Sequence, residues 1–209
     1  MTDAATHWER VYTETASDEV SWFEPTPRTS VELIGEAGIG KDVPIVDVGG
    51  GESHLAGELL DLGYTDVTVA DISATALKVA RAELGRKARE VHWDNADLLD
   101  HDFGRRFGLW HDRAVFHFLV EPTTRDAYLE AMRRGLAPDG QLVIATFGPQ
   151  GPTRCSGLPV QRYGAESLVG LLPDFELASS RIVQHRTPGG NKQQFQYARF
   201  MRRADQPAV

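Results

Sequence analysis

Between Pro44 and Leu60 the chain reads PIVDVGGGESHLAGELL, an apolar run followed by three glycines and an amphipathic pattern. This order predicts a buried strand near 44–48, a tight turn and a helix near 53–62. In open α/β sheets such a unit builds a ligand site, because the turn lies where the strand ends and the helix begins. Glycine lets the backbone approach a ligand without a Cβ in the way. The stretch therefore predicts an α/β fold that holds a nucleotide-like ligand.

Strand and helix patterns alternate along most of the chain, which predicts a doubly wound, mainly parallel sheet covered by helices. Further strands are expected near 66–70, 89–93, 107–111 and 140–147, and further helices near 3–13, 26–37, 73–84, 122–136 and 164–172. Two long strand patterns then follow, FELASSRIVQHR and NKQQFQYARFMRR, joined by the turn signal Thr187-Pro188-Gly189-Gly190. We therefore expect a seven-stranded α/β sheet ending in an antiparallel hairpin. It would form one domain over residues 1–209, with a flexible tail at 203–209.

Composition limits the partners of the chain. It has 22 Lys and Arg against 30 Asp and Glu, a net charge of -8, which disfavours long nucleic acids as partners. No run reaches the roughly 18 apolar residues of a membrane span, and MTDAATHWERVY lacks the apolar core of a secretion signal. The single cysteine, Cys155, excludes an internal disulfide framework and a thiolate zinc cluster. We expect a reduced, cytoplasmic protein without a metal site.

Two common nucleotide-binding turns do not fit the glycine segment. A phosphate-binding loop needs Gly-Lys-Ser/Thr, which does not follow Gly49. A dinucleotide turn needs a third glycine three residues after Gly51, where this chain has His54. What is left is Asp47, a carboxylate two residues before the first glycine. It suits an ammonium group better than a pyrophosphate, and the methionine part of S-adenosylmethionine (SAM) carries one.

Two more acidic residues follow the next two strands. Asp71 lies 24 residues after Asp47, about the spacing at which a βαβ unit places an acid on a ribose diol. Asp97 follows the third strand and can accept from an adenine amino group, with Leu98 behind the ring. Alone, Asp71 could be a helix cap and Asp97 a loop carboxylate. Together, at successive strand ends, these acids predict a SAM site along the carboxyl edge of the sheet.

Over nearly its whole length the sequence resembles the class I SAM-dependent methyltransferases. The residues that carry the resemblance are Asp47, Gly49, Gly51, Asp71 and Asp97. The segments FGLWHDRAVFHFL and GLAPDGQLVIATF are similar to the family's fourth strand and to the approach to its fifth. One departure is Ser53, where the family often has a third glycine, and serine can cap the following helix. The resemblance implies a Rossmann-like methyltransferase fold, with SAM as methyl donor and S-adenosylhomocysteine as product.

Aromatic residues gather in residues 1–37, which we expect to form N-terminal helices and a lid. Trp8 and Tyr12 share a helix face, and Trp22 and Phe23 precede the next helix. They either pack the helix onto the sheet or cover a sulfonium cation, for which Trp22 and Tyr12 are the better candidates. The pattern resembles both thiopurine/thiol methyltransferases and small protein-lysine methyltransferases. The residues expected to contact SAM are Tyr12, Trp22, Asp47, Gly49, Gly50, Gly51, Asp71, Ile72, Asp97 and Leu98.

The methyl acceptor is expected beside the end of the fourth strand, where the candidate catalytic residues are His111, Asp112 and Arg113. Arg113 offers a fork for an anionic acceptor, or else it pairs with Asp112. His111 is a possible base, needed only if the acceptor carries a proton. His117 is expected to pack a helix. LWHDRAVFHFLVEPTTRDAYLEAM resembles the thiopurine/thiol branch more than the lysine branch, and it lacks the Asn/Asp-Pro-Pro-Tyr/Phe segment of adenine and glutamine methyltransferases.

The Gly- and Pro-rich segment 148–163 follows the fifth strand at the same edge. It is either a plain capping loop or part of a basic, soft-lined pocket. The residues of that pocket would be Arg154, Cys155, Arg162, Tyr163, His185 and Arg186.

We accordingly predict an enzyme that methylates a small molecule, with a thiol or another soft nucleophile as one option. A protein-lysine methyltransferase is the first alternative, and Glu24 or Glu121 would line its acidic groove. A SAM-binding module without catalysis is the second alternative. Alignment of donor and acceptor would supply most of the catalysis, because methyl transfer from a sulfonium is an in-line displacement.

Overall fold

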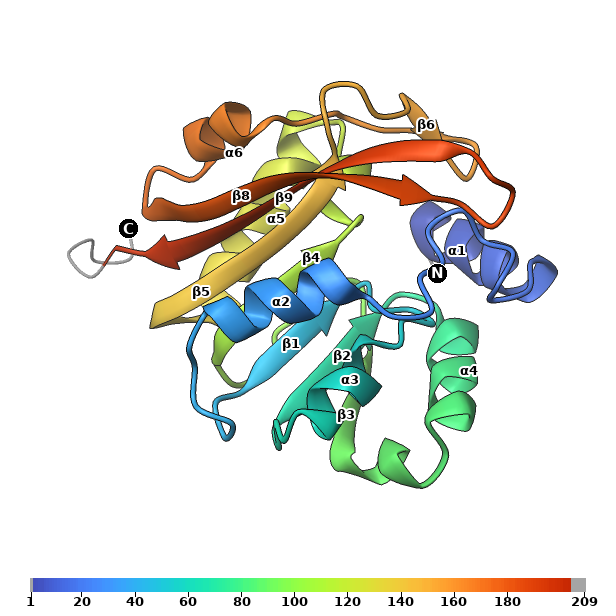
Figure 1. The fold of residues 1–209 in the computed structure, drawn as a ribbon, viewed down its shortest axis with the longest axis horizontal. Coiled ribbons are helices and arrows are strands. Elements are labelled where there is room, and N and C mark those ends of the chain that lie inside the picture. The colour runs from blue at the N-terminus through green and yellow to red at the C-terminus, as the bar shows by residue number, and fades with distance from the viewer. Residues whose placement is uncertain (1, 204–209) are drawn as a thin grey trace.

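The computed structural model describes residues 2–203 (Figure 1). The tail predicted after Arg203 lies outside these residues. The strands of the central sheet are β1 (Ile45–Val48), β2 (Val67–Asp71), β3 (Val91–Asn95), β4 (Phe107–Arg113), β5 (Leu136–Phe147), β8 (Phe175–Arg186) and β9 (Lys192–Arg202). Their order is β3-β2-β1-β4-β5-β9-β8, parallel from β3 to β5 and antiparallel at β9 and β8. The predicted seven-stranded sheet with a terminal hairpin is confirmed.

Helices cover both faces of this sheet, as the alternating pattern predicts. They are α1 (Asp3–Glu14), α2 (Arg28–Glu36), α3 (Leu55–Asp61), α4 (Ala74–Leu84), α5 (Pro122–Gly135) and α6 (Ala165–Leu171), with 3-10 turns η1 (Gly85–Glu90) and η2 (Phe116–Phe118). In Figure 1, α2 and α3 lie on the near face, α5 lies behind the sheet, and α1 stands beside α4 at the carboxyl end of the strands. No helix among residues 2–203 is both long and apolar enough to cross a lipid bilayer.

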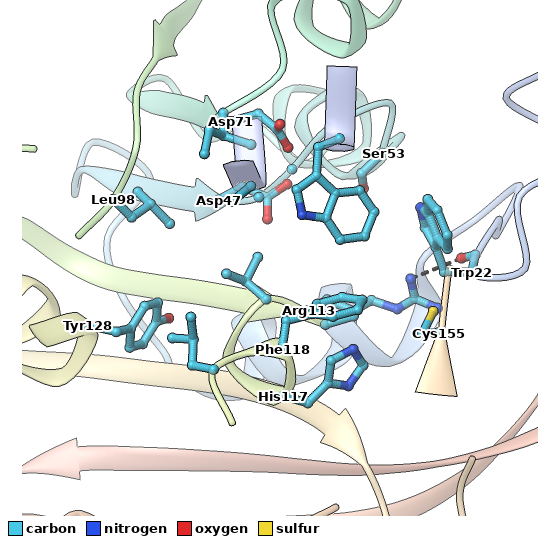
Figure 2. Close-up of a pocket in the computed structure, with 18 of the residues that line it drawn as sticks. Trp22, Asp47, Ser53, Asp71, Leu98, Arg113, His117, Phe118, Tyr128 and Cys155 are labelled. Atoms are coloured by element: carbon cyan, nitrogen blue, oxygen red, sulfur yellow. Dashed lines mark hydrogen bonds between the residues drawn. The ribbon is translucent and has the colours of Figure 1, made fainter. Parts of the chain in front are cut away.

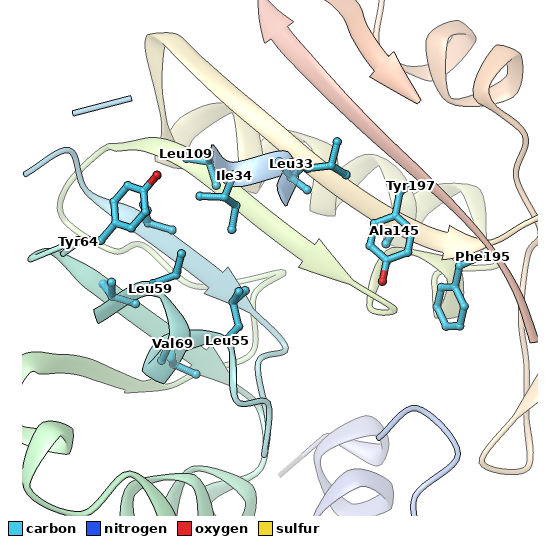
Figure 3. Close-up of a cluster of buried hydrophobic side chains, with 14 of the residues drawn as sticks. Leu33, Ile34, Leu55, Leu59, Tyr64, Val69, Leu109, Ala145, Phe195 and Tyr197 are labelled. Carbon is cyan, nitrogen blue, oxygen red and sulfur yellow. The ribbon is translucent and has the colours of Figure 1, made fainter. Parts of the chain in front are cut away.

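The period of two along a strand divides the core into two clusters. Ile45 and Leu109 face the cluster under α2 and α3, shown in Figure 3, whereas Val46 and Trp110 face the cluster under α5. Leu33 and Ile34 of α2 are completely buried on the first face. The same alternation decides which face each polar residue reaches near the strand ends, and it therefore positions the site.

The 148–163 segment contains a feature that the sequence analysis did not predict. Residues Arg154–Cys155 and Leu158–Pro159 form a small hairpin, β6 and β7. Its two turn residues, Ser156 and Gly157, both have positive φ, 47° and 78°. A two-residue turn of this kind matches the twist of paired strands. The segment therefore contains regular structure, a short antiparallel hairpin, and is not a plain loop.

Candidate functional site

A cavity of about 610 Å³ lies at the carboxyl ends of β1, β2, β3 and β4. This is where the chain order reverses, since β1 has β2 on one side and β4 on the other. In open α/β sheets ligands bind in this crevice, and the volume suits a small molecule. Nine of the ten residues predicted to contact a cofactor line it: Tyr12, Trp22, Asp47, Gly49, Gly50, Asp71, Ile72, Asp97 and Leu98.

Gly51 does not line the cavity, but it lies beside the residues that do. A Cβ on Gly51 would come within 2.5 Å of the Tyr12 hydroxyl, and its φ is +49°. A Cβ on Gly49 would approach Val115 to 2.0 Å. The turn needs glycine at these positions because neighbouring segments cross it closely. Ser53 Oγ accepts a hydrogen bond from the Leu55 N–H (3.1 Å), but the N-cap of α3 is His54, so Ser53 does not cap this helix as the sequence suggested.

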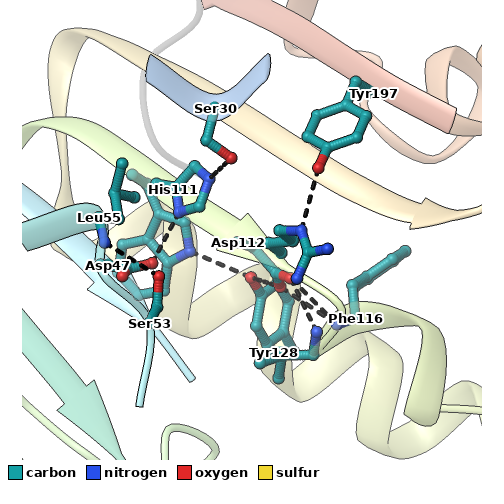
Figure 4. Close-up of polar contacts among 12 residues, drawn as sticks. Ser30, Asp47, Ser53, Leu55, His111, Asp112, Phe116, Tyr128 and Tyr197 are labelled. Atoms are coloured by element: carbon teal, nitrogen blue, oxygen red, sulfur yellow. Dashed lines mark hydrogen bonds and ion pairs between the residues drawn. The ribbon is translucent and has the colours of Figure 1, made fainter. Parts of the chain in front are cut away.

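Asp47 is held in place from the neighbouring strand. It lies directly opposite His111 in the β1–β4 pairing, and its Oδ1 is 2.6 Å from His111 Nδ1 (Figure 4). The other ring nitrogen of His111 is 2.8 Å from Ser30 Oγ. All three side chains are buried. Both nitrogens of His111 therefore have partners, and the predicted role of His111 as a base toward an acceptor does not fit. Within the described part of the chain, Asp47 Oδ2 has no hydrogen-bond partner.

Asp71 ends β2 with its carboxylate buried at the cavity. Its Oδ1 accepts a hydrogen bond from the Ser73 N–H (2.8 Å). Burial nevertheless raises the pKa of Asp71 to about 7. The N-cap of α4 is Ser73, whose Oγ accepts from the Ala76 N–H, so Asp71 does not itself cap the helix. Asp71 keeps acceptor capacity toward the cavity.

The helix α1 closes the cavity from the side of β2 and β3. Glu9 accepts hydrogen bonds from the hydroxyls of Thr75 and Ser73, on the first turn of α4. These bonds, Thr75 first, lower the pKa of Glu9. Thr2 donates its hydroxyl to Asp97 Oδ2 (3.3 Å). Hydrogen bonds from residues 2–9 thus reach the segments that follow β2 and β3, next to Asp71 and at Asp97.

Aromatic rings form the inner surface of this lid. The centroid of Trp8 lies 5.9 Å from that of Trp22 and 4.9 Å from that of Phe118, with the rings edge to face. Tyr12 lies 6.1 Å from Trp22. Trp8 and Phe23 also line the cavity, so they do more than pack α1 onto the sheet. Burial raises the pKa of Tyr12 well above its ordinary value, which keeps its hydroxyl protonated.

Arg113 holds the rest of the lid. Its Nη1 donates to the Trp22 carbonyl oxygen (3.0 Å), its Nη2 lies 3.1 Å from Glu24 Oε1, and its Nε donates to the Tyr197 hydroxyl (3.0 Å). Glu24 also lies 3.4 Å from His185 Nδ1. Burial alone would raise the pKa of Glu24. The neighbouring His185 and Arg113 outweigh this effect, so the pKa of Glu24 is lowered. Arg113 therefore pairs with Glu24 and not with Asp112, and its charge is already compensated.

Asp112 points to the opposite face of the sheet from His111 and Arg113, because consecutive strand residues alternate. It is completely buried, and the cavity lining does not include it. Tyr128 donates its hydroxyl to Asp112, and the N–H groups of Val115 and Phe116 donate to the same carboxylate at 2.9 and 3.1 Å. Burial raises its pKa to about 6. The prediction of a catalytic Asp112 is therefore corrected: this carboxylate holds the loop between β4 and η2.

The cavity has a carboxylate end and an aromatic end. The carboxylate end carries Asp47, Asp71 and Asp97; the aromatic end carries Trp8, His117, Phe118, Phe147, Cys155 and Phe195. Figure 2 shows Asp47, Asp71 and Leu98 on one side and His117, Phe118 and Cys155 on the other. Among the described residues, no group of three His, Cys, Asp or Glu could hold a metal ion.

The predicted basic pocket around Cys155 does not form. Cys155 lines the cavity, but the side chains of Arg154 and Arg162 bond to the carbonyls of Gly157 and Gly151 in their own segment. The predicted acidic groove does not form either. Glu24 is paired, and Glu121 is exposed outside the cavity.

Comparisons with known proteins match this architecture. Residues 45–140 match the family model described as a methyltransferase domain. The O-methyltransferase cnsE of Penicillium expansum is 30% identical over 158 residues, which are 69% of this chain and 55% of that protein. The chain thus spans about half the length of this curated relative.

Two solved structures share the fold. A SAM-dependent methyltransferase from Anabaena variabilis superposes with a TM-score of 0.76 at 20% identity, covering 97% of this chain and 96% of the other. The 1,6-didemethyltoxoflavin-N1-methyltransferase of Burkholderia thailandensis, with bound 1,6-didemethyltoxoflavin and S-adenosylhomocysteine, has a TM-score of 0.67 at 20% identity. That match covers 95% of this chain and 84% of the other.

Proposed function

We propose that this chain, which belongs to the class I SAM-dependent methyltransferases, transfers the methyl group of SAM to a small-molecule acceptor. The observation that carries the proposal is the row of carboxylates Asp47, Asp71 and Asp97 in one cavity, each at or close to the carboxyl end of a different strand of the sheet. The named activities of the relatives support it, since one is an O-methyltransferase and another an N1-methyltransferase with its small substrate bound.

Each carboxylate has a part of SAM to bind. The unpartnered Oδ2 of Asp47 accepts from the ammonium of the methionine part, while His111 holds the other oxygen. Asp71 accepts from the ribose hydroxyls. Asp97 accepts from the adenine amino group, with Leu98 and Ile72 against the ring. The glycine turn lets the backbone approach the same ligand, and the residues line one continuous space.

The reaction needs alignment more than acid–base chemistry. An electron pair on the acceptor atom forms a bond to the methyl carbon while the carbon–sulfur bond breaks, leaving neutral S-adenosylhomocysteine. The lid rings Trp8, Tyr12 and Trp22 favour the positive sulfonium and keep water away from it. Arg113 acts as a positioning residue, because it fixes the Trp22 carbonyl and Glu24. Holding the two reactants in line supplies the larger part of the rate enhancement.

A small acceptor fits the cavity better than a protein side chain. Residues between Thr2 and Pro27 line one side of the cavity, whereas α2 packs on the face of the sheet, and the aromatic end of the cavity is lined mainly by rings. Glu24, an acidic group at that end, is compensated by Arg113 and His185, so this carboxylate is not free to bind a lysine ammonium. A thiol acceptor rests on the resemblance to the thiopurine/thiol branch and is the narrower form of the proposal.

The test is transfer of labelled methyl from SAM, measured separately in the protein and small-molecule fractions of a desalted extract. Label in the small-molecule fraction supports the proposal, and label confined to a protein band overturns the small-molecule acceptor. SAM binding without any transfer would indicate a non-catalytic binding module. Asp71→Ala should abolish binding measured by calorimetry, whereas the control Asp61→Asn, on an exposed carboxylate paired with Lys87, should not.

A further inference from the structure

His117 is a buried polar residue that the proposed chemistry does not use. It lies on η2, has no exposed surface, and lines the aromatic end of the cavity. Its Nδ1 accepts a hydrogen bond from the Phe147 N–H at 3.1 Å. Its Nε2 has no hydrogen-bond partner among residues 2–203. A buried polar atom without a partner costs free energy and calls for an explanation.

The bond from Phe147 fixes the form of the ring. A neutral imidazole has one acceptor nitrogen and one N–H donor, and here Nδ1 is the acceptor. The proton is therefore on Nε2, which becomes an unpartnered donor. Burial, with Arg113 as a secondary cause, lowers the pKa of His117 to about 3, so the ring stays neutral at physiological pH. His117 can donate a hydrogen bond to a ligand, but it cannot take a proton from one without losing the Phe147 bond.

Aromatic side chains surround the His117 ring that carries this donor. The centroid of His117 lies 4.5 Å from that of Phe118 and 4.6 Å from that of Phe147, and Phe195 follows at 4.9 Å from Phe147. Trp8 extends the series beyond Phe118. Such walls favour a flat ligand that stacks against faces or meets edges.

The charges at this end cancel. The Arg113 guanidinium lies over the Phe195 ring, 5.0 Å from its centroid, and pairs with Glu24. A carboxylate or ammonium on a ligand would have to break this pair or stay unpaired in a buried place, and both are costly. The aromatic end therefore favours a ligand without a net charge.

We propose that the aromatic end binds a planar, uncharged heteroaromatic acceptor, and that His117 Nε2–H donates a hydrogen bond to a ring nitrogen or carbonyl oxygen of it. This inference rests on the proposed function and names its substrate class. His117 is then a specificity-determining residue: it orients the acceptor toward the methyl group and moves no proton.

Two substitutions separate this role from a structural one. In His117→Asn the amide oxygen can keep the bond from the Phe147 N–H, while the donor at the Nε2 position is lost. In His117→Gln the amide reaches the Nε2 position and can donate, while the Phe147 bond is lost. His92→Asn is the matched control, because His92 is exposed on β3 and outside the cavity. Melting temperatures check that all three variants fold.

The probes are hydroxyquinolines that differ in the position of the ring nitrogen, each compared with the naphthol of the same shape. Affinity is measured by calorimetry with S-adenosylhomocysteine present. Protection of Cys155 from alkylation reports the location, since it is the only cysteine of the chain and lines the aromatic end. For at least one pair we expect the wild type to prefer the quinoline, with the preference falling about fivefold in His117→Asn. His117→Gln should retain part of it, and His92→Asn all of it.

Three results would overturn the inference: no pair shows a preference that depends on His117, no probe binds, or charged analogues protect Cys155 better than neutral ones. Calorimetry with S-adenosylhomocysteine alone tests the proposed function separately. If that ligand fails to bind, the proposed function fails, whatever the probes do. If it binds and the probes show no dependence on His117, only the substrate class is wrong.

Discussion

Replacing Asp71 by Asn should stabilise the protein while weakening its cofactor site. Burial raises the pKa of Asp71 from 3.8 to about 7, so the folded chain holds this proton more tightly than the unfolded chain. The contribution of Asp71 to stability is therefore greatest at low pH and is lost as the pH rises from about 4 to about 7. A shift of this size corresponds to about 4 kcal/mol once the carboxylate is fully ionised.

Asn carries no charge and can still accept the hydrogen bond from the Ser73 N–H. The free energy of unfolding of Asp71→Asn, minus that of the wild type, should thus increase by about 2–3 kcal/mol between pH 5 and pH 8 and then level off. Other titrating groups cancel in this difference. The same substitution should weaken the affinity for SAM at pH 8 at least tenfold, because it removes a charged acceptor for the ribose hydroxyls.

The assay is urea unfolding followed by tryptophan fluorescence at four pH values, with calorimetry for SAM. A difference that does not change with pH would refute the reasoning, and so would a variant less stable than the wild type at pH 8. In either case the carboxylate would be well solvated or already compensated in the folded chain.

Three further changes test other parts of the site. Gly50→Ala would place a Cβ 2.8 Å from Asp47 Oδ2. We expect this variant to lose about 1–3 kcal/mol in stability and to bind SAM at least tenfold more weakly. Wild-type affinity in calorimetry would contradict this expectation. Tyr128→Phe removes the hydroxyl that donates to Asp112. In urea unfolding this variant should be about 1–3 kcal/mol less stable than the wild type, while its affinity for SAM stays within about twofold of the wild-type value. An unchanged unfolding curve would refute the role given to this hydrogen bond. Trp22→Ala should weaken SAM more than the uncharged S-adenosylhomocysteine, by several-fold, and equal losses would exclude a cation–π contact.

The sheet and the row of acids could be predicted because both depend on local order. Parallel strands end at the same edge, so Asp47, Asp71 and Asp97 meet in the cavity whatever the details of packing. The glycine turn was equally readable, since the fit of Gly49 and Gly51 depends on a few neighbouring residues. These features need only the identity and the spacing of residues along one segment.

The candidate catalytic group was harder to predict. Three consecutive residues of β4 cannot all face one cavity, and the alternation of the strand sends Asp112 to the far face. This signal was present in the sequence. The partners of Arg113 were not, because Glu24 and Tyr197 come from segments 89 residues before it and 84 after it. Only the folded arrangement brings them together.

His117 was expected to be packing, and its ring does pack between Phe118 and Phe147. What the pattern does not reveal is that one ring nitrogen accepts a hydrogen bond from the backbone, while the other has no partner among the residues that the structure describes. The hairpin at Cys155 was more accessible, since Ser156-Gly157 is a common two-residue turn.

The hydrogen bonds that join Glu9 of α1 to the start of α4 have a consequence for turnover. Glu9 bonds to Ser73 and Thr75, and Ser73 also donates its N–H to Asp71. A ligand bound to Asp71 would therefore be linked to α1 through Ser73 and Glu9. The cavity has one lid over both ends, so a lid that closes on the donor first would shut out the acceptor unless it reopens. We therefore expect the acceptor to enter only while α1 is open, so that the opening of α1 limits the rate of each cycle.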